Sequence, residues 1–154
     1  MLKICCFNLC LLQTPLMSLL SIIDFLQPLN IHQLSDDEGY RNNQIGSSIC
    51  MHEEELPPIE NADIVLVGCG ETRGAGMQGE YSTSAPDAVR KEFYSLYQWH
   101  TNVKLADVGN IKPGASLADT YAALKAVISE LLEQDKKVVV LGGSHDLTLG
   151  QYQA

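Results

Sequence analysis

The residues best suited to chemistry lie near the end of the chain, where the string VVVLGGSHDLT contains His145 and Asp146. Gly142 and Gly143 precede them, and glycines allow the backbone to approach another group closely. A neutral imidazole in such a place can bind a divalent metal ion, with nearby carboxylates completing the coordination. On the residues alone, His145 is therefore a candidate metal ligand, and a purely structural histidine is the alternative.

Asp146 has two interpretations. As a neighbour of a metal ligand, its carboxylate could orient the imidazole. The string HDLTLGQY also has the pattern of a helix beginning, and aspartate is a good residue to cap a helix N-terminus. We favour the helix cap.

A second candidate site is the glycine-rich loop GCGETRG at residues 68–74, which resembles a dinucleotide-binding fingerprint. Gly68 and Gly70 fit that pattern, but Arg73 occupies the third glycine position. No helix is expected until Pro86, so the loop lacks the free helix amides that hold a pyrophosphate. Arg73 could instead bind a substrate carboxylate; we expect a solvated loop arginine.

The elements that must position these residues alternate between strand and helix from residue 61 onward. Strands are predicted at 62–68, 102–111 and 137–143, and helices at 86–99 and 116–137. Such alternation favours an α/β fold with a parallel sheet, in which functional groups gather at the carboxyl ends of the strands. The third strand is apolar throughout, as expected for a strand covered by helices on both faces.

The segment 116–137 is the clearest helix. Ser116 and Asp119 have the spacing of a capping box. We expect a buried stripe made of Leu117, Tyr121, Leu124, Ile128, Leu131 and Leu132. Elsewhere, His32, His52 and His100 are interpreted as surface histidines, and Asp107 either lies near a metal or caps a turn. The aromatic residues Tyr94, Tyr97 and Trp99 suit helix packing or a subunit contact.

Composition limits the possible partners and compartments. The net charge of −9 over 154 residues argues against nucleic acid or an anionic membrane as the main partner. Five cysteines, an odd number crowded toward one end, do not form the pattern of a secreted disulfide framework, so we expect a cytoplasmic protein. Residues 1–16 imitate a signal peptide, but Asn8 interrupts the apolar run. We interpret 1–16 as an extension outside the domain, with an export signal as the alternative, 17–60 as an N-terminal arm, and 61–154 as the main α/β domain.

Four stretches together resemble the arginase/agmatinase/formimidoylglutamase (ureohydrolase) family. VVVLGGSHDLTLG resembles its first metal-binding motif, a strand followed by Gly-Gly-Asp-His-Ser. SAPDAVRKEFYSLY is similar to its Gly-Pro-x-x-Ile-Arg helix start, NVKLADVGNI to its second strand, and IVLVGCGETRGAG to its first strand and loop. The order agrees from about residue 62 to the end, and GGSHDLT is most similar to the bacterial formimidoylglutamase branch.

The resemblance implies a three-layer αβα fold that holds two manganese ions. In that family the metals bridge a hydroxide that attacks the carbon of a guanidinium or formimino group. His145 matches the first-motif metal ligand, whereas Ser144 and Asp146 depart from the family's aspartate and serine. The family's Asp-x-His-x-Asp and Asp-x-Asp motifs do not occur in these 154 residues.

The chain therefore resembles the N-terminal portion of a longer metallohydrolase, and its fold is expected to be incomplete. We expect a small-molecule substrate and a homo-oligomer, no activity of this portion alone, and no catalytic residue within it. The alternatives are a non-catalytic module with the arginase fold and, with less support, a nucleotide-binding domain.

Overall fold

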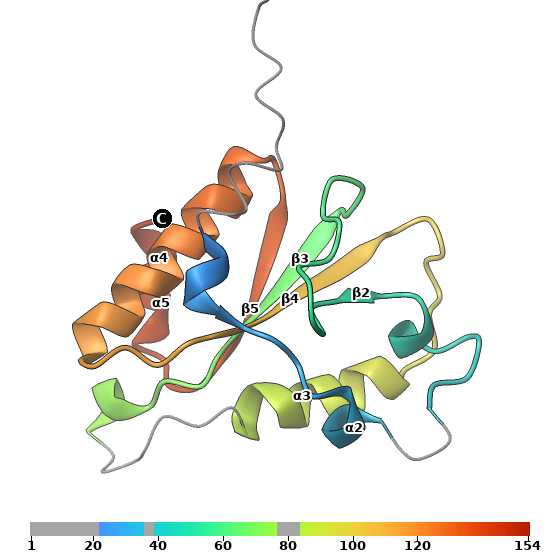
Figure 1. Ribbon diagram of the computed structural model, residues 1–154, viewed down its shortest axis with the longest axis horizontal. Helices are drawn as coiled ribbons and strands as arrows, with labels where there is room; N and C mark the ends of the chain where they lie inside the picture. The colour runs from blue at the N-terminus through green and yellow to red at the C-terminus, as the bar shows by residue number, and fades with distance from the viewer. Residues whose placement is uncertain (1–21, 36–38, 77–83) are drawn as a thin grey trace, which may run out of the picture.

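The computed structural model describes residues 22–35, 39–76 and 84–154 (Figure 1). Along these residues the elements are η1 (Ile23–Phe25), β1 (Leu26–Gln27), α2 (Ile31–Leu34), η2 (Ile45–Ser47), β2 (Cys50–Met51), β3 (Ile64–Cys69), η3 (Arg73–Ala75), α3 (Ser84–Ser95), β4 (Leu105–Ile111), α4 (Leu117–Glu133), β5 (Lys137–Gly142) and α5 (Leu147–Tyr152). The predicted strands and helices from residue 61 onward are all confirmed, with bounds that differ by a few residues. The interpretation of residues 1–16 lies outside the described residues, and the boundary at 61 stays a prediction.

The core of the sheet is parallel. β3 pairs with β4 on one side and with β5 on the other, so that Val65 lies opposite both Ala106 and Val138. The sheet as a whole is mixed, however, because β1 runs antiparallel to β4, with Leu26 opposite Ile111. β2 is parallel to β4 and pairs with its first half, while β1 pairs with its end. The expectation of an entirely parallel sheet is corrected in this one respect.

Part of the segment before residue 61, namely residues 25–29 and 50–52, lies along the outer edge of β4. Its chain makes backbone hydrogen bonds from Leu29 N to His52 O at 2.7 Å and from His52 N to Asp107 O at 2.9 Å. His52 is 3% exposed, and its Nδ1 lies 2.9 Å from the carbonyl oxygen of Val108. The prediction of a surface histidine is therefore wrong for His52, because β1 and β2 flank β4 at this point and enclose the ring.

Alternating residues of the strands face two separate helix layers. Val65 and Val67 share a core cluster with Leu124 and Val127 of α4. Between them in the sequence, Leu66 shares a different cluster with Tyr94 of α3. Since successive strand residues point to opposite faces, α4 and α3 cover opposite sides of the sheet, as Figure 1 also shows. The predicted three-layer αβα arrangement is confirmed.

Helix α4 begins as the sequence predicts. Ser116 and Asp119 form a complete capping box, in which each side chain accepts a hydrogen bond from the other residue's backbone N–H. The buried stripe contains Leu124, Ile128 and Leu131 as expected, but its remaining members are Thr120, Ala123 and Val127. Leu132 is 48% exposed, so its assignment to the stripe was wrong. Leu132 follows Leu131 by one position and so lies about 100° around the helix axis, beyond the stripe.

β5 forms one edge of the sheet and is less covered than its apolar sequence predicts. Val138 and Val140 pack against the main core cluster. Val139, on the other face, is 43% exposed, so the expectation of cover on both faces is wrong. Among the described strands, β5 pairs with β3 alone. In the same described part of the chain, no helix is both long and apolar enough to cross a membrane.

Candidate functional site

The carboxyl ends of β3 and β5 bring two loops together at one edge of the sheet. His145 follows β5 and is exposed. It contributes to a hollow of about 500 Å³ whose lining residues are Thr72, Gly74, Ala75, Gly143, Ser144, His145 and Asp146. A neighbouring hollow of about 250 Å³ shares His145 and extends toward Thr148 and Gln151 on α5. The imidazole therefore borders two solvent-accessible spaces at the edge where functional groups were expected.

The loop after β3 holds the residues before His145 in place. The backbone carbonyl of Glu71 accepts a hydrogen bond from Ser144 N at 2.9 Å and another from Ser144 Oγ at 3.1 Å. At Gly143, an added Cβ would lie 2.2 Å from the same carbonyl oxygen. Gly143 thus permits the close backbone approach that the two consecutive glycines predicted.

Glu71 is buried and ion-paired with Arg73. Arg73 Nη2 lies 2.6 Å from Glu71 Oε2, and Arg73 Nε lies 2.9 Å from Oε1. The guanidinium also donates to Gly114 O at 3.2 Å and to Thr120 Oγ1 at 3.1 Å, which joins this loop to the start of α4. The hydrogen bond from Arg73 lowers the pKa of Glu71 and outweighs the opposing effect of burial. Arg73 is therefore a bridge between two loops, and the expectation of a merely solvated arginine was wrong.

Asp146 occupies the N-cap position of α5, but its side chain forms no cap hydrogen bond. Instead, its Oδ2 accepts a hydrogen bond from the hydroxyl of Tyr121. Its Oδ1 is buried and has no hydrogen-bond partner among the described residues. The favoured helix-cap role was therefore wrong, because Tyr121 of α4 draws the carboxylate away from the amides of α5.

The carboxylate of Asp146 packs against Gly74 in the loop after β3. A Cβ added to Gly74 would come within 1.9 Å of Asp146 Oδ2 and 2.5 Å of Tyr121 Oη. Burial raises the pKa of Asp146, but the polar surroundings supplied by Ser144 and Tyr121 outweigh this effect and leave the pKa below its usual value. Burial, together with the hydrogen bond to Asp146, raises the pKa of Tyr121 to about 12. The pair is a phenol donating to a carboxylate at neutral pH.

Asp107, at the end of β4, is committed to structural contacts. Arg90 Nε lies 2.8 Å from its Oδ2 and Arg90 Nη2 lies 3.0 Å from its Oδ1. Tyr94 Oη donates to Oδ2 at 2.7 Å, and Gly109 N donates to Oδ1 at 2.9 Å. Both carboxylate oxygens of Asp107 therefore accept hydrogen bonds from other residues of the protein. Burial, together with the nearby charge of Asp107, raises the pKa of Tyr94. The contact to Gly109 is a turn-capping bond of the kind that the sequence analysis considered.

Cys69 and the aromatic residues around the end of α3 lie outside the lining of this site. Cys69 is the last residue of β3 and fully buried, and this burial raises the pKa of its thiol to about 11. It therefore stays protonated and does not line the hollow beside His145. Tyr94 is buried, whereas Tyr97 and Trp99 are 57% and 83% exposed and stack edge to face with ring centroids 5.7 Å apart.

The described residues do not by themselves fit a two-metal centre. Among them, no group of three or more histidine, cysteine, aspartate or glutamate side chains lies close enough to hold a metal ion. His145 supplies one exposed imidazole, and the adjacent residue Asp146 has a buried Oδ1 without a hydrogen-bond partner among the described residues. The arrangement fits a single ligand of a larger centre.

Sequence reasoning missed Glu71, which accepts hydrogen bonds from Arg73 in its own loop and from Ser144 in the loop after β5. Nothing in the string CGETRG marks Glu71 as buried, since a glutamate in a glycine-rich loop is normally solvated. The available signal was the i,i+2 arginine, which could have suggested an internal pair.

Comparisons with known proteins agree with this geometry. The model of the Arginase family matches residues 62–154. The chain is 29% identical over 109 residues to a formimidoylglutamase of Streptococcus gordonii, covering 66% of this chain and 32% of that protein. It is 28% identical over 130 residues to a formimidoylglutamase of Streptococcus pyogenes serotype M3, covering 79% of this chain and 39% of that protein. The matched part of the chain thus spans between 32% and 39% of the length of these relatives, and the chain belongs to the arginase family.

Proposed function

We propose that this chain forms the N-terminal portion of a hydrolase of the arginase family that cleaves a C–N bond in a guanidino or formimino substrate. The observation that carries the proposal is the position of His145. It lies exposed between two hollows at the carboxyl edge of the sheet, where the family's first metal-binding motif places its histidine. The names of the relatives, both formimidoylglutamases, support a formimino substrate.

Within this proposal the chain contributes one ligand and the structure that holds it. His145 offers an imidazole nitrogen to one of two manganese ions, and the contacts of Ser144 to Glu71 fix the loop from which the ring projects. Arg73 holds that loop against α4, and we assign it a positioning role in preference to binding substrate. Because one imidazole cannot hold two metal ions, we expect this portion alone to bind manganese weakly and to have no turnover.

The same single ligand supports a second candidate, a non-catalytic module with the arginase fold. For either function we propose a cytoplasmic protein that binds a small molecule. A homo-oligomer is supported by the exposed apolar residues Val89, Leu96, Tyr97 and Trp99 on and after α3.

The test that separates the two candidates begins with the gene. If the reading frame beyond codon 154 encodes Asp-x-His-x-Asp and Asp-x-Asp, the encoded protein with manganese should release formamide, ammonia or urea from an amidine substrate. The 154-residue chain, assayed in parallel, should release none. A stop codon directly after Ala154 favours the module, and manganese-dependent turnover by the 154-residue chain would show the proposal to be wrong.

A further inference from the structure

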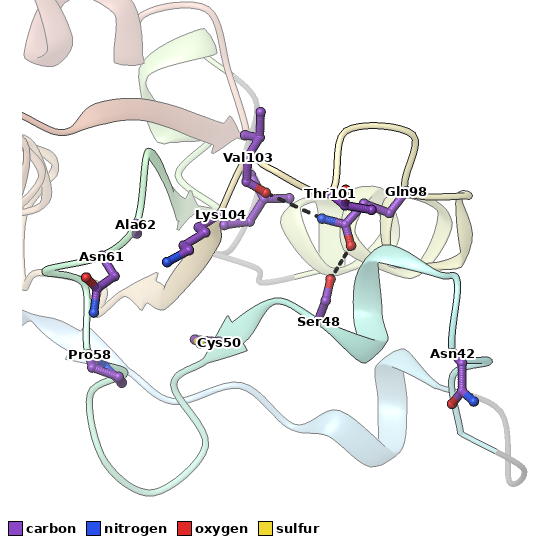
Figure 2. Close-up of a pocket in the computed structure, with 11 residues that line it drawn as sticks. Asn42, Ser48, Cys50, Pro58, Asn61, Ala62, Gln98, Thr101, Val103 and Lys104 are labelled. Carbon is purple, nitrogen blue, oxygen red and sulfur yellow. Dashed lines mark hydrogen bonds between the residues drawn. The ribbon is translucent and has the colours of Figure 1, made fainter.

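A second cavity lies at the opposite, amino-terminal edge of the sheet. Its volume is about 460 Å³, within the range of cavities that hold small molecules. One wall comes from the segment that contains Ser48, Cys50 and Asn61, and the other from the connection between α3 and β4 (Figure 2). It shares no residue with the hollows beside His145, so it is a separate site.

The charge of this cavity has one source. Lys104 is the only charged residue in its lining, and no carboxylate lines it. Figure 2 shows the Lys104 ammonium extending into the space near Asn61 and Cys50. Among the described residues no carboxylate forms an ion pair with this ammonium; the neighbouring Asp63 uses its Oδ2 to accept from the Lys104 backbone N at 2.8 Å. Lys104 is therefore the one charge that the lining itself offers to a ligand.

Neutral hydrogen-bond donors surround that charge. Asn61 and Thr101 line the cavity and make no side-chain hydrogen bond within the described part of the chain. Gln98 is oriented by its neighbours: its Oε1 accepts from Ser48 Oγ, and its Nε2 donates to Val103 O at 3.4 Å. An amide nitrogen carries two hydrogens, so Gln98 keeps one for a ligand.

Besides Asn42 and Cys50, the rest of the lining is aliphatic and consists of Pro58, Ala62, Val103 and Leu105. A ligand that satisfies this cavity needs a negatively charged end for Lys104 and the amides, and an aliphatic end for these four residues. A single ammonium matches a single negative charge, whereas a phosphate dianion would leave one charge without a cation.

We propose that this cavity binds a small organic monocarboxylate with a short aliphatic stem. Lys104 pairs with the carboxylate, Asn61 and Gln98 donate to its oxygens, and the stem lies against Val103 and Leu105. The proposal does not depend on the hydrolase function, because the site lies at the other edge of the sheet.

The test uses the 154-residue chain and 3-methylbutanoate as the probe. Saturation-transfer difference NMR follows the methyl signals of the probe at constant ionic strength. We expect saturable transfer, little transfer to the neutral isostere 3-methylbutanamide, and no displacement by equimolar inorganic phosphate. Lys104→Gln should raise the dissociation constant about tenfold, the loss expected for one charge-assisted hydrogen bond.

Two further variants complete the design. Lys112→Gln is the matched control, because Lys112 is an exposed lysine outside the cavity, and it should bind as the wild type does. The variant Lys104→Glu should no longer bind 3-methylbutanoate and should instead bind the cation 3-methylbutylamine. Any one of four results would overturn the proposal. These are saturation transfer that does not saturate, equal binding of 3-methylbutanamide, displacement of the probe by phosphate, and an unchanged dissociation constant in Lys104→Gln.

Discussion

The backbone carbonyl of Glu71 accepts two hydrogen bonds from Ser144, the residue immediately before His145. The carboxylate of the same glutamate is held by Arg73 at 2.6 Å. The candidate metal ligand is therefore positioned by a buried acid on a different loop, and that acid is in turn neutralised by an arginine that reaches α4. Four of our predictions test this assembly and the edge of the sheet beside it.

Replacing Arg73 with leucine should lower the free energy of unfolding, and by clearly more than the control substitution Arg41→Leu does. The change leaves the buried carboxylate of Glu71 without its cation, which is costly, but Arg73 is partly exposed and water can compensate in part. Urea unfolding measures the effect. The control is Arg41→Leu, since Arg41 is exposed and forms no ion pair among the described residues, and it should change the value by less than about 0.5 kcal/mol. Equal losses in both variants would contradict the bridging role.

The pair also predicts a specific dependence of stability on pH. The pKa of Glu71 is lowered in the folded state by the hydrogen bond from Arg73, so the unfolded chain binds the proton more readily. The stabilisation is fully present above the unfolded value of about 4.3 and is lost as pH falls through the lower folded value. Glu71→Gln should be less stable at pH 7, with a flatter loss of stability below about pH 4.3. The exposed Glu92→Gln serves as control, and if both variants lose stability with acid as steeply as the wild type, Glu71 does not carry this dependence.

Gly74→Ala should cost more stability than Gly76→Ala, although both glycines lie in one loop. At Gly74 the new methyl group meets Asp146 Oδ2 and Tyr121 Oη, so the loop must move away from the site, at about 1–3 kcal/mol. Gly76 has φ +68° but open space around it, so alanine there incurs only the backbone penalty of about 1 kcal/mol. Thermal unfolding of the two variants decides the matter, and a larger loss at Gly76 would show that the loop does not press on Asp146.

The uncovered edge strand should make the 154-residue chain associate with itself. β5 pairs only with β3 in the described sheet, and Val139 is 43% exposed on it. Val139→Lys should shift the chain toward monomer in sedimentation velocity, whereas Leu149→Lys, which replaces another exposed apolar residue on α5, should not. A wild-type chain that is a monodisperse monomer and melts cooperatively would contradict the expectation.

Local sequence signals predicted the elements of the fold well. The capping box at Ser116 and Asp119 located the start of α4, and the β-branched runs located the three parallel strands. These features depend on residues close together in the chain, where spacing alone determines the structure. The short strands β1 and β2 were not predicted, because two-residue strands have no periodicity and form only against the edge of β4.

The site was predicted less completely, because its contacts join distant segments. Asp146 has the residue type and position of a helix cap, but the hydroxyl of Tyr121, from another helix, determines where its carboxylate points. His52 was expected in solvent and Glu71 was not singled out, and each is buried beside a partner that the local sequence does not reveal. The sequence did predict that His145 follows a strand and two glycines. That position depends only on neighbouring residues in the chain.

The most direct test of the central claim is the effect of manganese on the NMR signals of the four histidines. Bound Mn²⁺ broadens nearby protons even when binding is weak, so substoichiometric additions to the 154-residue chain reveal which ring it approaches. We predict that the ring protons of His145 broaden first, that those of the exposed His32 and His100 follow only at higher concentrations, and that His145→Ala removes the effect. Equal broadening of the three exposed rings, or a sharp His145 signal beside a broadened His100, would show that His145 is not the metal ligand.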